Sequence, residues 1–196
     1  MNIRFWPSWL LTLLLGVAGP AHAHSAGGVA GGFLSGFLHP IAGPDHVVAM
    51  VAVGLWGAFL GRPAVWLLPV VFPMVMAFGG ALGVLGVPLP GVEIGIACSA
   101  IVLGGMVALA ARPPLWVAAV IVGCFAIFHG HAHGTELPES ASPVAYSLGF
   151  VIATGLLHAG GIGLSLLSHW RHGGLLVRAL GAAIAALGVY YLVRAL

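Results

Sequence analysis

The chain has 196 residues, of which 61% are apolar and only 5% are charged, and its mean hydropathy is +1.14. A water-soluble domain of this composition would leave most of its apolar surface in water, so the sequence indicates an integral membrane protein. The net charge of +2 is spread thinly and provides no basic patch for nucleic acid. The chain contains no lysine, so it has no GxxxxGK(S/T) loop for ATP hydrolysis. Any transport is therefore passive, ion-coupled or driven by a partner.

The first segment, Met1–Ala23, is typical of a secretory signal peptide. It combines an early Arg4, an apolar run over Trp9–Val17 and a small-residue exit before His24. An uncleaved first helix is the alternative, but the apolar run is shorter than the ~20 residues of a span. Cleavage would expose His24, whose amine and imidazole together can chelate one metal ion. The mature N-terminus would then lie outside the cytoplasm.

We expect six membrane-spanning helices in residues 24–196, which would form one transport domain. Each apolar stretch is close to the ~20 residues that a span requires, although the first and the fourth are short. The expected spans are Asp45–Gly61, Ala64–Gly86, Val92–Ala111, Leu115–His129, Ala145–Leu167 and Leu175–Val193. The predicted fold is an all-α integral membrane protein, a six-helix transmembrane bundle with a broken or re-entrant first helix behind a cleavable signal peptide.

Charged and aromatic residues predict the orientation of these spans. With the mature N-terminus outside, the loop arginines fall on the cytoplasmic side and the glutamates outside, as the positive-inside tendency requires. They are Arg62, Arg112, Arg171 and Arg178 against Glu93, Glu136 and Glu139. Two interfacial belts would follow, with Trp56, Trp66, Trp116 and Trp170 at the inner ends and Tyr146, Tyr190 and Tyr191 at the outer ends. We therefore expect a multi-pass protein of the bacterial inner (cytoplasmic) membrane with a periplasmic N-terminus.

A first polar motif, HPIAGPDH at His39–His46, interrupts the apolar sequence. Its prolines and glycine predict a helix that ends near His39, unwound backbone, and a new helix from about Pro44. We interpret the preceding 28–38 as a half-helix, because a full span there would reverse the orientation. Half-helix ends and free carbonyls attract cations, and ionisable groups at membrane depth mark functional sites. His39, Asp45 and His46 are therefore expected metal ligands.

A second cluster, FHGHAHGTE at Phe128–Glu136, lies on the same side of the membrane. Alternating histidines between glycines favour a loop that wraps a borderline divalent metal such as Ni²⁺, Cu²⁺ or Zn²⁺. A solvated loop with no specific ion is the alternative. His129, His133 and Glu136 are the stronger ligand candidates, and His131 is expected to be the most exposed.

Three other side chains carry weaker expectations. His158 lies near the middle of the fifth span, where it either lines the transport path or bonds a neighbouring carbonyl. Met50 follows His46 by one turn and offers either a soft sulfur ligand or ordinary packing. Cys98 and Cys124 have similar depth on different spans, which does not by itself bring them within disulfide reach, so we expect unpaired thiols.

The two motifs, HPxxGxDH and FHGxAHGxE, in a small six-span chain resemble the HupE/UreJ family of hydrogenase and urease accessory nickel permeases. The resemblance covers the whole mature chain. It implies Ni²⁺ uptake into the cytoplasm by facilitated diffusion for the maturation of nickel enzymes, with a functional link to cytoplasmic nickel chaperones. By motif position it assigns roles to His39, Asp45, His46, His129, His133 and Glu136, and it leaves His131 at a variable position. No permanent cofactor is implied, and Co²⁺ or Zn²⁺ could be carried instead of Ni²⁺.

Two other functional classes use the same side chains. An intramembrane Zn²⁺-dependent hydrolase would hold its metal by histidines and activate water with a carboxylate. The chain lacks an H-E-x-x-H pair, and Ser35 and Ser165 have no G-x-S-x-G setting, so we do not expect an enzyme. A nickel sensor or storage protein that binds without conducting is the third possibility.

Overall fold

The computed structural model describes residues 29–137 and 142–196, and all the secondary structure in these residues is helical. The elements in chain order are α2 (Val29–Ala42), α3 (Pro44–Leu60), α4 (Ala64–Val84), α5 (Val92–Ala108), α6 (Leu115–Thr135), α7 (Pro143–Ser165), the short 3-10 helix η1 (Leu166–His169) and α8 (Gly173–Ala195). The predicted signal peptide, His24 and Glu139 fall outside the described residues.

Four helices of the described chain are long and apolar enough to cross a membrane: α4, α6, α7 together with η1, and α8. The count reaches five when α2 and α3 are taken as one span, since they are apolar together but bent by 81° at their junction. The expected break in the first span is therefore confirmed. α5 is also apolar but has only 17 residues, short of the ~20 that a perpendicular span needs.

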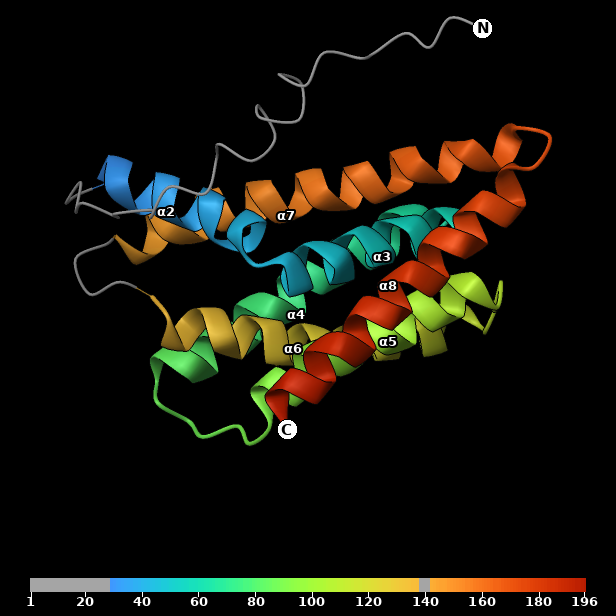
Figure 1. Cartoon of the computed structure of the whole chain (residues 1–196). Coiled ribbons are helices and arrows are strands. Elements are labelled where there is room, and N and C mark those ends of the chain that lie inside the picture. Colours follow the sequence, from blue (N-terminus) through green and yellow to red (C-terminus); the bar gives the residue numbers. More distant parts are fainter. Residues whose placement is uncertain (1–28, 138–141) are drawn as a thin grey trace, which may run out of the picture.

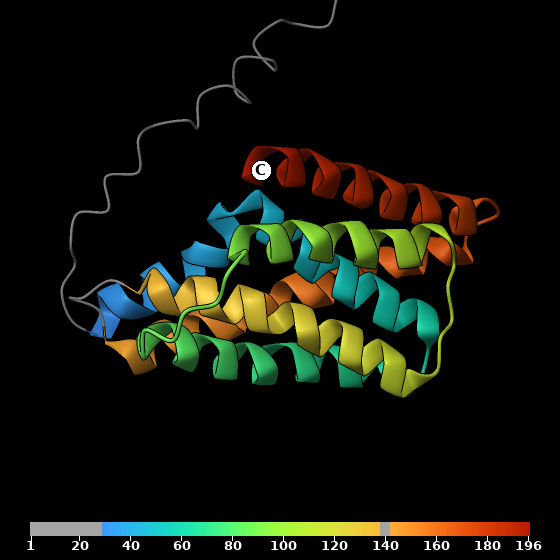
Figure 2. The same ribbon diagram turned by 90° about the horizontal axis from the view of Figure 1, so that it is seen from below.

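The helices pack as three pairs around α3 (Figure 1). α4 lies along α6, α5 along α8, and α2 along α7, while α3 contacts α2, α4, α5, α7 and α8. In Figure 2, α3 lies between the α5/α8 pair and the α4/α6 pair. The most buried large side chains include Trp56, Met50 and Leu55 of α3. The helix that carries Asp45 and His46 is thus the centre of the bundle.

Glycines allow the backbones of α4 and α6 to touch. A Cβ at Gly130 would collide with the carbonyl of Met76, and one at Gly134 with the carbonyl of Gly80. Small residues at a helix interface permit this approach where lipid provides no hydrophobic drive. The contact fixes the rotation of α6, and with it the direction in which its histidines point.

The end of the bundle opposite the two histidine motifs is held together by hydrogen bonds from side chains to backbone carbonyls. Trp56 donates its indole N–H to Ala111 at 3.1 Å, and Arg178 donates to Ala108 at 2.7 Å. Arg112 lies 4.6 Å above the Phe59 ring. Trp56 is fully buried, because its indole packs inside the bundle and donates to a carbonyl of the protein. Its assignment to an interfacial belt was therefore wrong.

Of the other predictions for aromatic residues and cysteines, one was wrong and the rest agree with the structure. Trp66, Trp116 and Trp170 are exposed, as an interfacial belt requires. Tyr146 is only 4% exposed, so its assignment to the outer belt was wrong. Cys98 and Cys124 are free thiols, as expected.

Candidate metal site

The break that positions the first motif is shorter than the sequence suggested. α2 continues through Pro40 to Ala42, and Gly43 alone separates it from α3. Gly43 has extended dihedrals, φ −93° and ψ 101°, because a residue before proline is disfavoured in the α region. The expected stretch of unwound backbone from His39 to Pro44 was therefore wrong. The junction still places His39 in the last turn of α2 and Asp45 in the first turn of α3.

The second motif is helical and not a loop. α6 runs to Thr135, because Gly130 and Gly134 serve the close contact with α4 described above. Helical geometry then puts His129 and His133 on one face, four residues apart, and turns His131 away from them. The expected flexible, metal-wrapping loop was wrong, but the same helix presents a more rigid pair of imidazoles.

Three imidazoles, one from α3 and two from α6, form a buried cluster. The ring centroid of His46 lies 4.9 Å from that of His129 and 4.5 Å from that of His133. His129 is fully buried, and the other two are 5 to 9% exposed. The two sequence motifs are thus brought together, as predicted from their common side of the membrane.

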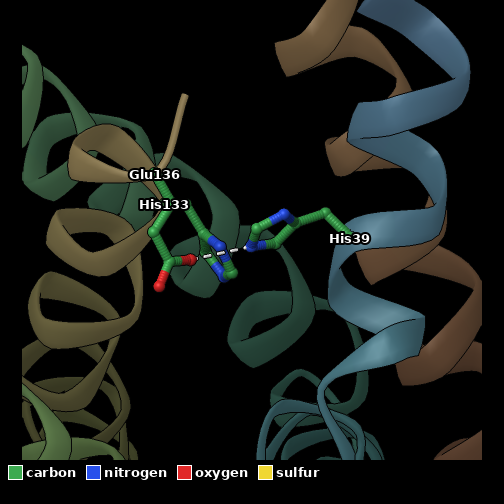
Figure 3. Close-up of side chains that lie close together, drawn as sticks. All are labelled: His39, His133 and Glu136. Carbon is green, nitrogen blue, oxygen red and sulfur yellow. Dashed lines mark hydrogen bonds and ion pairs between the residues drawn. The ribbon is translucent and has the colours of Figure 1, made fainter. Parts of the chain in front are cut away.

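A more exposed group adjoins this cluster through His133 (Figure 3). His39 Nε2 lies 2.9 Å from Glu136 Oε2, and the rings of His39 and His133 are 4.8 Å apart. Ligand atoms of His39, His133 and Glu136 all lie within 4.8 Å of one another, the one group of three that the described residues bring so close. Two imidazoles and a carboxylate suit a borderline divalent metal.

Asp45 determines which nitrogen of His46 is free. Its Oδ1 accepts the backbone N–H of His46 at 2.9 Å and lies 3.0 Å from Nδ1 of the same residue. An ionised carboxylate can only accept, so Nδ1 carries the proton and Nε2 of the neutral ring keeps its lone pair. Nε2 is buried and has no hydrogen-bond partner among the described residues. Asp45 therefore orients the imidazole of His46 with Nε2 free to bind an ion.

Ser99 of α5 does the same for His129. Its hydroxyl donates to the carbonyl of Ile96, so its oxygen accepts the N–H from His129 Nε2 at 2.9 Å. A serine has one hydroxyl proton, and this arrangement leaves the lone pair of His129 on Nδ1. Nδ1 is also buried and unpartnered in the described structure. A hydrogen bond of this kind is how proteins fix the tautomer of a metal-binding histidine.

Known proteins with similar sequences place the chain in a family. The sequence model of the HupE/UreJ family, described as HupE / UreJ protein, matches residues 12–191. Protein HupE of Rhizobium leguminosarum bv. viciae is 46% identical over 187 residues, which cover 95% of this chain and 98% of that protein. The chain belongs to the HupE/UreJ family. No solved structure matches it.

Other predicted residues of this HupE/UreJ protein lie apart from the cluster. His131 is 7% exposed, and its Nε2 lies 2.7 Å from the carbonyl of Val87, to which it donates. His131 is the most exposed of the three histidines of the second motif, as expected, but it is still buried because it joins α6 to the loop after α4. Met50 is fully buried in the hydrophobic core. His158 is 1% exposed and lies deeper in α7.

Sequence reasoning missed two side chains beside the motifs. Ser99 is one of several hydroxyls on apolar helices, and no local signal connects it with a histidine on another helix. Tyr146 lies 5.9 Å from His39 between ring centroids, and its buried hydroxyl has no partner within the described chain. Its position, a tyrosine at an outer helix end, was equally compatible with a lipid-facing belt.

Asp45 also borders a separate cavity of about 260 Å³ that Glu93, Tyr190 and Arg194 line. The carboxylates of Asp45 and Glu93 come from the first turns of α3 and α5, where the positive ends of the helix dipoles favour negative charge. Asp45 thus contacts the histidine cluster through His46 and also borders this cavity.

Proposed function

We propose that this HupE/UreJ protein is a permease for a divalent transition metal, with Ni²⁺ as its first candidate. The observation that carries the proposal is the continuous series of imidazoles from half-exposed His39, through His133 and His46, to fully buried His129. A storage or sensor site needs no ligands that continue into the bundle. Family membership supports nickel among the metals that imidazole and carboxylate ligands would accept, which also include Co²⁺ and Zn²⁺.

The direction of transport in this proposal is from periplasm to cytoplasm. It rests on the distribution of arginines: Arg62, Arg112 and Arg171 lie in the connections opposite the histidine end, and positive loops favour the cytoplasm. The proposal includes six spans, with α5 as a short one and α2/α3 as a broken one. It also includes cleavage of the signal peptide 1–23, a mature N-terminus in the periplasm, and location in the bacterial inner membrane.

The driving force we propose is the membrane potential together with the metal gradient. A divalent cation that moves across 100 mV gains about 4.6 kcal/mol, twice the value for one charge. Uptake would then need neither ATP nor a permanently bound cofactor. Delivery to cytoplasmic nickel chaperones, and from them to hydrogenase or urease, completes the proposed role.

Flux into proteoliposomes tests this function. The purified full chain is reconstituted with a Ni²⁺-sensitive dye inside the vesicles, without nucleotide, and an inward-positive or inward-negative potential is imposed with K⁺ and valinomycin. We expect Ni²⁺ influx that an inward-negative potential accelerates. Binding of Ni²⁺ without flux would identify a storage or sensor protein, and a strict requirement for ATP would exclude the proposed mechanism.

A further inference from the structure

One face of α7 carries polar atoms that run inward from the histidine cluster. Tyr146, Phe150, Thr154 and His158 follow one another at intervals of four residues, so they lie along one side of the helix. The Tyr146 hydroxyl, the Thr154 hydroxyl and both ring nitrogens of His158 are buried, and none has a hydrogen-bond partner in residues 29–137 or 142–196. The stripe extends roughly 18 Å along the helix axis, at ~1.5 Å per residue.

Buried polar atoms without hydrogen-bond partners lower the stability of a protein, so several of them on one helix face need an explanation. A buried polar group without a partner destabilises a protein by about 1–3 kcal/mol, and lipid offers no water to relieve it. Thr154 is fully buried and His158 is 1% exposed. Valine and leucine would fill the same positions without this cost. Unpartnered groups of this kind call for a ligand or another functional reason.

A single aromatic ring separates His158 from the outer histidines. The centroid of Phe72 lies 5.5 Å from that of His129 and 5.4 Å from that of His158, with the last two rings perpendicular. Phe72 is fully buried. An ion that leaves His129 toward the inner half of the bundle would therefore meet Phe72 before His158.

α4 supplies a further candidate oxygen near His158. Pro73 lies inside α4 and has no N–H for the carbonyl of Pro69, which helical bonding would otherwise satisfy. Pro69 lies one turn before Phe72 in α4, and the Phe72 ring contacts the imidazole of His158, whose two nitrogens have no hydrogen-bond partner in the described chain. Carbonyls released at irregular points of membrane helices are recurrent cation ligands.

The backbone around His158 is held closely. A Cβ at Gly54 of α3 would collide with the carbonyl of His158, and one at Gly161 of α7 with the carbonyl of Val51. α3 and α7 therefore touch at this residue and again about one turn later, at Gly161. The imidazole is positioned by two helices whose backbones cannot separate without losing that contact.

We propose that Thr154, His158 and the Pro69 carbonyl form a second, inner cation site, which Phe72 separates from the outer histidines. The inference rests on the proposed function and assigns that function a second binding step. The inner site takes a divalent transition metal ion that has already lost part of its hydration shell. Its ligands are neutral and few, and this suits conduction, because an ion must leave each site as readily as it enters.

Two apolar replacements test the inner site: His158→Leu and Thr154→Val. Each removes unpartnered polar atoms, so thermal stability of the purified full chain should stay equal or rise. Equilibrium dialysis with Ni²⁺ alone should give wild-type affinity, because the outer group remains. Ni²⁺ flux into proteoliposomes should fall at least 10-fold for His158→Leu and severalfold for Thr154→Val. His172→Leu, a histidine at the exposed start of α8, is the matched control and should conduct like the wild type.

The possible results separate the inner site from the proposed function. Wild-type flux in both variants would overturn the inner site and leave the permease intact. Loss of stability and affinity in parallel with flux would show a structural role and would also overturn it. A wild-type chain that binds Ni²⁺ but never conducts would overturn the permease, and with it the inner site. Phe72→Leu places a smaller side chain between His129 and His158, so selection between ions should weaken and the ratio of Mn²⁺ flux to Ni²⁺ flux should rise. An unchanged ratio would overturn the proposal that Phe72 separates the two sites.

Discussion

Replacement of Asp45 by asparagine separates two roles that one carboxylate has in this site. Asp45 accepts from Nδ1 of His46 at 3.0 Å, which fixes the tautomer, and it also brings a negative charge near the proposed ion. The asparagine oxygen can still accept from Nδ1, so Asp45→Asn keeps the tautomer and removes the charge. Asp45→Ala removes both, and Asp45→Glu keeps the charge on a longer side chain.

The size of the charge effect follows from the geometry. Oδ1 lies 3.0 Å from Nδ1, the far ring nitrogen is about 2 Å beyond, and a metal on Nε2 adds about 2 Å, which gives roughly 7 Å in all. Opposite charges of one and two units at that distance attract by about 5 kcal/mol at an effective dielectric constant of ~20 and by about 1 kcal/mol in water. The Asp45 side chain is 23% exposed, so an intermediate effect is expected. We expect Ni²⁺ affinity to fall about 10- to 100-fold, the range typical of partners behind a metal ligand.

Equilibrium dialysis and initial flux, measured at equal protein content, check this expectation. Flux at Ni²⁺ concentrations below saturation should fall with affinity in Asp45→Asn, fall further in Asp45→Ala, and recover partly in Asp45→Glu. Equal affinity in Asp45→Asn and the wild type would refute the electrostatic role. Equal loss in the asparagine and alanine variants would instead show that the tautomer contributes nothing.

Three further predictions follow from contacts in the bundle. Ser99→Ala should lower Ni²⁺ affinity about 10-fold by releasing the His129 tautomer, whereas Ser165→Ala, which loses the same i−3 carbonyl bond without a histidine, should leave it unchanged in dialysis. His131→Leu should lower the melting temperature through the lost bond to Val87 and keep Ni²⁺ binding. His133→Leu should weaken Ni²⁺ binding without lowering the melting temperature. The opposite pattern would show that the path follows His131. Gly130→Ala should destabilise the chain by about 1–3 kcal/mol through its collision with Met76, whereas Gly155→Ala, which meets open space, should not, as thermal unfolding in detergent would measure.

The helices were predictable because lipid restricts the alternatives. A chain in hydrocarbon must satisfy its backbone within each helix, so apolar stretches such as Ala64–Gly86 and Leu115–His129 gave helices with starts correct to the residue. The meeting of His46 with His129 was also predictable, since the arginines placed both motifs at one end. The lengths of the apolar stretches determine the helices, and the positions of the arginines determine which motifs share an end of the bundle. Both can be read directly from the sequence.

The remaining details depend on contacts between helices. Gly130 and Gly134 favour a loop by local propensity, yet their lack of a side chain is what lets α6 continue against α4. Ser99 and Tyr146 join the site only because α5 and α7 have particular rotations about their axes. Such rotations are set by packing, and no local sequence pattern reports them.

The distribution of ligands along the bundle is itself an argument for conduction. The group of three candidate ligands that includes a carboxylate, His39, His133 and Glu136, lies nearest the exposed end of the series, where that carboxylate would help to remove an ion from water. The buried imidazoles of His46 and His129 are candidate ligands whose free nitrogens are fixed by Asp45 and Ser99. Beyond Phe72 the ligands are fewer still. Affinity should therefore decrease inward, and an inward-negative potential, at about 4.6 kcal/mol per 100 mV for a divalent ion, can offset that decrease. A storage protein would have its strongest site in the interior.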